Sequence, residues 1–175
     1  ANIKQAAFDA INQNFSHYSP VPGFLELRQA IAKKLKRDNN LDYKPSQICV
    51  SNGAKQSILN VLAAVVNDGD EVILPAPYWV SYDEMVKMMG GTSVFIETNI
   101  DTEFKMTAEQ LEAAITPKTK VILYSSPCNP SGSYYTKDEL EKIANVVAKY
   151  PYVTIISDEI YEYINYDGKH TSIAE

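Results

Sequence analysis

The stretch Ile155-Ile156-Ser157-Asp158-Glu159-Ile160-Tyr161 decides how this chain is interpreted. Two β-branched residues run into an acidic residue and a tyrosine follows three positions later, which is typical of a buried strand that ends in a carboxylate. Open α/β sheets bind their ligands at the carboxyl ends of their strands. Because burying a carboxylate is costly unless it meets a cation, we expect Asp158 to face a cationic group in a binding site.

Composition narrows the class of protein. The 175 residues are 45% hydrophobic and 22% charged, which is typical of a soluble globular domain with a real core. A net charge of −6 argues against a nucleic-acid or anionic-membrane partner, and no stretch has the length of a membrane span. Cys49 and Cys128 lack zinc or CxxC spacing, so they indicate no metal site and predict reduced thiols in a cytoplasmic protein, with a mutual disulfide as the alternative.

Apolar spacing predicts helices that alternate with strands. We expect helices from Asn2 and over 24–37, 54–66, 79–89, 108–115 and 137–149, and strands over 48–50, 71–74, 92–97, 119–124 and 153–157. Thr107 with Gln110 and Thr136 with Glu139 fit capping boxes at two helix starts. The alternation predicts an α/β fold with a mainly parallel sheet and helices on both faces.

Two segments that follow predicted strands carry unusual residues. Ser51–Gln56 joins a predicted strand to a helix and contains small residues. Either its free N–H groups form a cradle for a phosphate, or the segment is an ordinary strand–helix turn. Pro75–Trp79 holds the only tryptophan of the chain behind two prolines. The rigid turn presents the indole to a flat ligand, or the indole packs in the core at a helix start.

Two further segments also lie at strand ends. Ser125–Gly132 is a stiff loop in which either X-Pro bond can be cis, and Asn129 offers its amide to a ligand oxygen or caps its own backbone. Asp158 can serve a ligand or cap a following helix, and Tyr161 can serve the same ligand or pack on the surface. All four segments follow predicted strands, and this convergence predicts one shared binding site.

In combination, order and spacing, these residues resemble the class I aminotransferases of the aspartate aminotransferase type, which use pyridoxal 5'-phosphate. The resemblance covers nearly the whole chain and rests on Tyr18-Ser19-Pro20-Val21-Pro22-Gly23 with Leu27-Arg28, Gly53-Ala54-Lys55-Gln56, Pro77-Tyr78-Trp79-Val80-Ser81-Tyr82, Asn129-Pro130-Ser131-Gly132 and Ser157-Asp158-Glu159-Ile160-Tyr161. It implies a truncated large domain of the fold type I transferases. Residues 1–39 would form a helical arm, and residues 40–175 a cofactor-binding domain that is incomplete at its C-terminus.

The resemblance also implies a role for each site residue. Gly53, Ala54 and Lys55 would hold the cofactor phosphate, and Trp79 would stack on the pyridine ring. The other implied contacts are those of Asn129 and Tyr161 with the phenolic oxygen, of Asp158 with the protonated ring nitrogen, and of Tyr18 with the phosphate in a neighbouring subunit. Trp79 and Asn129 would also contact the substrate, and the whole enzyme would be a homodimer.

The lysine that forms the Schiff base in this family has no counterpart at its expected place. Lys169 follows Tyr161 too closely and sits in a polar turn, so we expect no catalytic residue in this chain and a lysine downstream. The chain would then be a fragment that is inactive by itself.

The function expected from the resemblance is amino-group transfer between an amino acid and a 2-oxo acid, with aspartate as the favoured donor. Two alternatives stay open at this point. One is a pyridoxal-phosphate-dependent C–S lyase or synthase on the same fold. The other is a non-catalytic aminotransferase-like domain that senses the cofactor.

Overall fold

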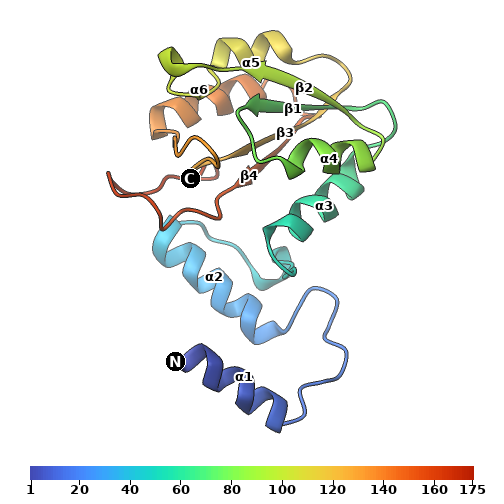
Figure 1. The fold of residues 1–175 in the computed structure, drawn as a ribbon, viewed down its shortest axis with the longest axis vertical. Coiled ribbons are helices and arrows are strands. Elements are labelled where there is room, and N and C mark those ends of the chain that lie inside the picture. The colour runs from blue at the N-terminus through green and yellow to red at the C-terminus, as the bar shows by residue number, and fades with distance from the viewer.

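The sheet has four parallel strands in the order β2-β1-β3-β4. The structure is a computed structural model that describes all residues from 1 to 175. The strands are β1 (Glu71–Ala76), β2 (Thr92–Glu97), β3 (Thr119–Ser125) and β4 (Thr154–Asp158). The chain passes from β1 to β2 on one side and then to β3 on the other, so loops after β1 and β3 leave the sheet in opposite directions (Figure 1). Such a switch point is where open α/β sheets form their binding crevices.

Six α-helices accompany the sheet, and their positions agree with the predicted ones to within about two residues. They are α1 (Asn2–Asn12), α2 (Leu25–Asn39), α3 (Ala54–Val65), α4 (Ser81–Met88), α5 (Ala108–Ala114) and α6 (Lys137–Val147), with short 3₁₀ turns at Pro45–Gln47 and Ile100–Thr102. Both predicted capping boxes are present: Thr107 caps α5 and Thr136 caps α6, each accepting a backbone N–H with its side chain.

Alternating strand residues build a core on each face of the sheet. Ile73 and Ile122 point to one face, where they pack with α5 and α6. Their neighbours Val72, Leu74 and Val121 point to the other face and pack with α3 and α4. Figure 1 shows the two helix pairs on opposite sides of the sheet. The predicted α/β fold with a parallel sheet and helices on both faces is therefore confirmed.

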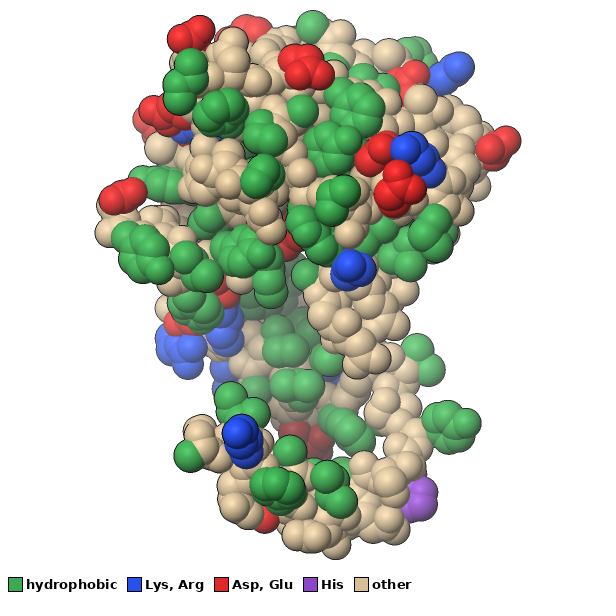
Figure 2. Space-filling model, viewed as in Figure 1, with side chains coloured by type: hydrophobic (Ala, Val, Ile, Leu, Met, Phe, Trp, Pro, Cys, Tyr) green, Lys and Arg blue, Asp and Glu red, His purple; other side chains and the backbone are tan.

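The first two helices lie away from the sheet, in the lower part of Figure 1. Helix α1 has no buried residue, and α2 buries only Asn39. Hydrophobic side chains are visible on this part of the surface in Figure 2, and those of Ile3, Phe8 and Ile11 are exposed. The division into an arm over 1–39 and a domain over 40–175 stays a prediction.

One predicted strand is wrong. Residues 48–50 are not part of the sheet, although Ile48 has an extended backbone. The N–H of Val50 donates to Pro22 O at 3.0 Å, in the turn before α2, so the segment meets a turn instead of another strand. A β-branched pair favours extended backbone, but a strand also needs a neighbour with which to form a ladder.

Candidate functional site

A cavity of about 230 Å³ lies at the carboxyl edge of the sheet, at the switch point between β1 and β3. It collects residues from four separate segments of the chain, and its ten lining residues are Gly53, Ala54, Lys55, Trp79, Tyr82, Ser125, Asn129, Asp158, Ile160 and Tyr161. Seven of these are the residues that the sequence predicted for one site, namely Gly53, Ala54, Lys55, Trp79, Asn129, Asp158 and Tyr161. The predicted convergence into one cavity is confirmed, although the first segment follows an extended loop and not a strand.

Asp158 is the last residue of β4 and forms part of the cavity wall. It is 8% exposed, and its carboxylate accepts from the Tyr82 hydroxyl at 2.6 Å and from the N–H of Ile160 at 3.2 Å. Burial and the hydrogen bond to Asp158 raise the pKa of Tyr82 well above its usual range, so Tyr82 stays protonated and donates. No lysine, arginine or histidine forms an ion pair with Asp158.

A second part of the wall attracts anions. Gly53 precedes α3 with φ 88° and ψ 163°, a backbone conformation that is open almost only to glycine. No side chain caps α3, in contrast to α5 and α6, so the N–H groups of its first turn keep their capacity to bind an anion. Lys55 adds a positive charge, and its Nζ lies 4.7 Å from the centre of the Trp79 ring without a carboxylate partner.

The loop after β3 brings Asn129 to the cavity. The peptide bonds Ser126–Pro127 and Asn129–Pro130 are both cis, as the sequence allowed, and so is Ala76–Pro77 after β1. Asn129 Nδ2 lies 3.4 Å from the hydroxyl oxygen of Tyr161, with the amide as donor. In this contact the phenol oxygen accepts, which leaves the phenol proton free to be donated to a ligand oxygen.

Tyr18 is the one predicted site residue that the structure does not bring to the cavity. It is fully exposed and lies beside Phe15 and Phe24, between α1 and α2. The predicted role of Tyr18 is in the site of a neighbouring subunit, and that role stays a prediction.

Three residues that line the cavity have no role predicted from the sequence, namely Tyr82, Ser125 and Ile160. Tyr82 is the important omission because it is buried and holds Asp158 directly. A signal for it was present: Tyr82 follows Trp79 by three residues, at the start of a helix, and the two rings meet edge to face at 5.8 Å.

The donor set of the cavity suits a flat molecule that is anionic at one group and cationic at another. The first turn of α3 and Lys55 offer sites for an anion, whereas the buried Asp158 carboxylate lacks a cation. Trp79 supplies a flat aromatic wall, and Asn129 with Tyr161 supplies donors for an oxygen. Pyridoxal phosphate combines these features in a phosphate, an aromatic ring, a phenolic oxygen and a basic ring nitrogen. The residues present therefore fit the cofactor that the sequence resemblance implies.

The chain belongs to the aminotransferase class I and II family, whose sequence profile matches residues 1–174. It is 50% identical over 175 residues to the "Probable aspartate/prephenate aminotransferase" of Rickettsia bellii, a match that covers 99% of this chain and 44% of that protein. It is 49% identical over 175 residues to the aspartate aminotransferase of Bacillus sp. strain YM-2, again over 99% and 44%.

The crystal structure of the aspartate aminotransferase from Rhizobium meliloti superposes with a TM-score of 0.96 at 41% identity, over 99% of this chain and 44% of that one. The resemblance inferred from the motifs is therefore confirmed at the level of family and fold. The chain spans less than half the length of these relatives.

None of the six α-helices combines the length and the hydrophobicity that a membrane span requires. No group of three or more histidine, cysteine, aspartate or glutamate side chains has the arrangement of a metal site. Cys49 and Cys128 are unpaired, so the alternative of a disulfide between them is wrong for this structure.

Proposed function

We propose that this chain contributes the cofactor-binding wall of a pyridoxal-phosphate-dependent aminotransferase. The observation that carries the proposal is the shared cavity, in which a buried carboxylate without a cation faces the same space as an uncapped helix start and a lysine. A buried charge of this kind costs several kcal/mol if it stays unpaired, so a cationic ring nitrogen is its natural partner (~3–5 kcal/mol for a broken buried pair).

In this proposal each wall residue performs one task. The N–H groups of Ala54 and Lys55, with the turn that Gly53 permits, hold the phosphate. Trp79 stacks on the ring, Asn129 and Tyr161 donate to the phenolic oxygen, and Trp79 and Asn129 also meet the substrate. Asp158 keeps a proton on the ring nitrogen because a carboxylate favours the protonated form of a neighbouring base.

The bound cofactor supplies an electron sink for reactions at the α-carbon of an amino acid. The protein's part is to orient the ring and to hold its charge, and Tyr82 fixes the Asp158 carboxylate for that purpose with its hydroxyl. The lysine that binds the cofactor covalently is proposed to lie in the remainder of the protein. The homodimer with Tyr18 at the neighbouring site and the cytoplasmic location belong to the same proposal.

The proposed substrates are an amino acid and a 2-oxo acid, with aspartate as the amino donor. The name of the Rickettsia bellii relative supports aspartate and adds prephenate as a 2-oxo acid acceptor to be tested. The name of the Bacillus relative supports aspartate alone. The C–S lyase and the cofactor sensor lack such support.

The test uses the full-length protein that carries this chain. With aspartate as donor, the wild-type protein should form oxaloacetate only when 2-oxoglutarate or prephenate is present, because amino transfer needs an acceptor. Asp158→Ala should lower this rate at least about 100-fold, which corresponds to 2.7 kcal/mol of lost stabilisation. Asp167→Ala is the matched control because Asp167 is exposed and its carboxylate has no partner, so its rate should be unchanged. Acceptor-independent keto-acid formation, or full activity of Asp158→Ala, would contradict the proposal.

A further inference from the structure

We propose that Glu159 and Glu162 are positioning residues for Asp158 and Tyr161: their carboxylates fasten the loop of residues 159–172 at two points and so fix the two cofactor contacts. This inference deepens the proposed function and rests on it. Neither glutamate lines the cavity, so neither acts on a bound molecule by direct contact.

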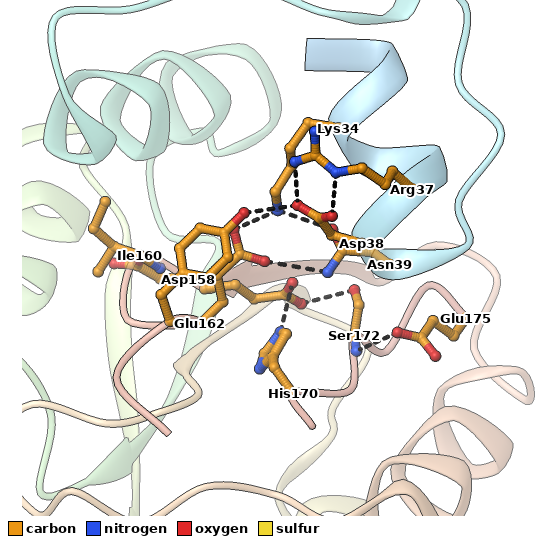
Figure 3. A network of polar contacts seen from close by, with 12 residues as sticks. Lys34, Arg37, Asp38, Asn39, Asp158, Ile160, Glu162, His170, Ser172 and Glu175 are labelled. Atoms are coloured by element: carbon orange, nitrogen blue, oxygen red, sulfur yellow. Dashed lines mark hydrogen bonds and ion pairs between the residues drawn. The ribbon is translucent and has the colours of Figure 1, made fainter. Parts of the chain in front are cut away.

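Glu159 closes the base of the loop. Its Oε1 accepts from the hydroxyls of Ser157 and Ser172, both at 2.8 Å, and its Oε2 lies 3.0 Å from His170 Nε2. His170 and Ser172 are themselves buried, and Figure 3 shows both side chains directed toward the same carboxylate. The Glu159 side chain therefore joins the end of β4 to His170 and Ser172, which lie 11 and 13 positions later in the sequence.

The surroundings of the Glu159 carboxyl group favour its ionised form. Burial by itself would raise the pKa of this carboxyl group, but the hydrogen bonds from His170, Ser172 and Ser157 outweigh it and lower the pKa. An ionised carboxylate accepts hydrogen bonds about twice as strong as those of a neutral group. The base of the loop is therefore held most firmly when Glu159 is charged.

Glu162 fastens the opposite side of the loop to helix α2. It forms an ion pair with Lys34 and accepts from Asn39 Nδ2 at 3.2 Å. Asn39 is 3% exposed, and Lys34 also donates to its Oδ1 at 2.9 Å, so the three side chains form one connected group (Figure 3). The next residue, Tyr163, adds a hydrogen bond to Asp38 at 2.8 Å.

Side-chain contacts hold this loop in place because its backbone is not part of a helix or strand. The chain has no helix or strand after β4, and the backbone hydrogen bonds at the start of the loop are Glu162 N–H to Glu159 O at 3.0 Å and Ile164 N–H to Tyr161 O at 2.7 Å. Glu159 adjoins Asp158 at the end of β4, and Glu162 adjoins Tyr161, so each glutamate holds the backbone next to one of the two cofactor contacts. A displacement of about 1 Å at such contacts is enough to weaken a site severely.

The experiment measures the dissociation constant of pyridoxal phosphate from the full-length apoprotein by absorbance titration. Glu159→Ala and Glu162→Ala should each bind about tenfold more weakly, which equals 1.4 kcal/mol. Glu159→Gln keeps one acceptor oxygen and should recover part of the loss. The control is Asp167→Ala, which removes a charge from the same loop without removing a contact and should bind like the wild type.

A double-mutant cycle with Tyr161→Phe separates positioning from general loss of structure. Glu159→Ala raises the dissociation constant by a certain factor in each background. If Glu159 acts through Tyr161, this factor should be at least about three times smaller in the Tyr161→Phe protein than in the wild type. Equal losses in both backgrounds, or losses no larger than that of the Asp167 control, would overturn the inference. If Glu159→Ala does not fold, Ser172→Ala replaces it in the cycle, since it deletes one of the three donors.

The outcome also distinguishes this inference from the proposed function. If Tyr161→Phe and Asp158→Ala by themselves leave cofactor binding intact, the proposed function fails and the positioning role fails with it. If both weaken binding while the two glutamate variants behave like the control, only the positioning role is overturned.

Discussion

The hydrogen bond between Tyr82 and Asp158 makes the sharpest prediction about this chain. Tyr82 is 1% exposed and donates to the carboxylate at 2.6 Å, across 76 residues of sequence. Tyr82→Phe deletes the hydroxyl and keeps the ring, so the packing against Trp79 is preserved. The carboxylate then retains only the N–H of Ile160 among the donors that it has in the structure.

The expected cost follows from the charge of the acceptor. A hydrogen bond to a charged group contributes about 1.5–3 kcal/mol, so the free energy of unfolding of the apoprotein should fall by about that amount. Tyr78→Phe is the matched control, because the Tyr78 hydroxyl makes no hydrogen bond while its ring stacks on Phe95 at 5.4 Å. That control should change the free energy by no more than about 0.5 kcal/mol.

Urea unfolding of the full-length apoprotein measures both values. The same Tyr82→Phe substitution in an Asp158→Asn protein tests the contribution of the negative charge. A neutral acceptor should reduce the effect of Tyr82→Phe to roughly half, because charge-assisted hydrogen bonds are about twice as strong as neutral ones. The reasoning is refuted if Tyr82→Phe costs no more than Tyr78→Phe, or if the cost is the same with aspartate and asparagine at position 158.

Two further predictions concern the turn before α3 and the base of the 159–172 loop. Gly53→Ala should lower the free energy of unfolding by about 1–3 kcal/mol, and backbone strain at its φ of 88° is the sole cause because an added Cβ meets nothing within 4 Å. Gly168→Ala is the control: its site is equally open but has no positive φ, so the substitution should cost little. Equal costs of the two substitutions would refute the strain argument. The pKa of Glu159 is lowered in the folded state from 4.5, so its stabilisation is present above that pH and is lost as pH falls through the folded pKa. Glu159→Gln should therefore flatten the acid side of the stability curve, as measured by urea unfolding at a series of pH values, and an unchanged slope would contradict this.

The sequence by itself determined the alternation of elements and seven of the ten residues that line the cavity. The apolar runs of β1 and β3, and capping pairs such as Thr107 with Gln110, are local patterns that a short window contains in full. The chemistry at strand ends was equally visible, because parallel strands deliver their carboxyl ends to one edge wherever the intervening helices lie.

Only the tertiary structure decided which side chains meet. Residues 48–50 have strand-like residues but no partner strand, and that absence depends on how the turn at Pro22 is placed. The pairing of Tyr82 with Asp158 and of Lys34 with Glu162 joins positions 76 and 128 residues apart. Hydrogen bonds of this kind are set by packing across the whole domain, whereas propensity and periodicity act over a few turns of backbone. The chemistry of the site was therefore present in the sequence, and the support that holds it in place appeared only in the fold.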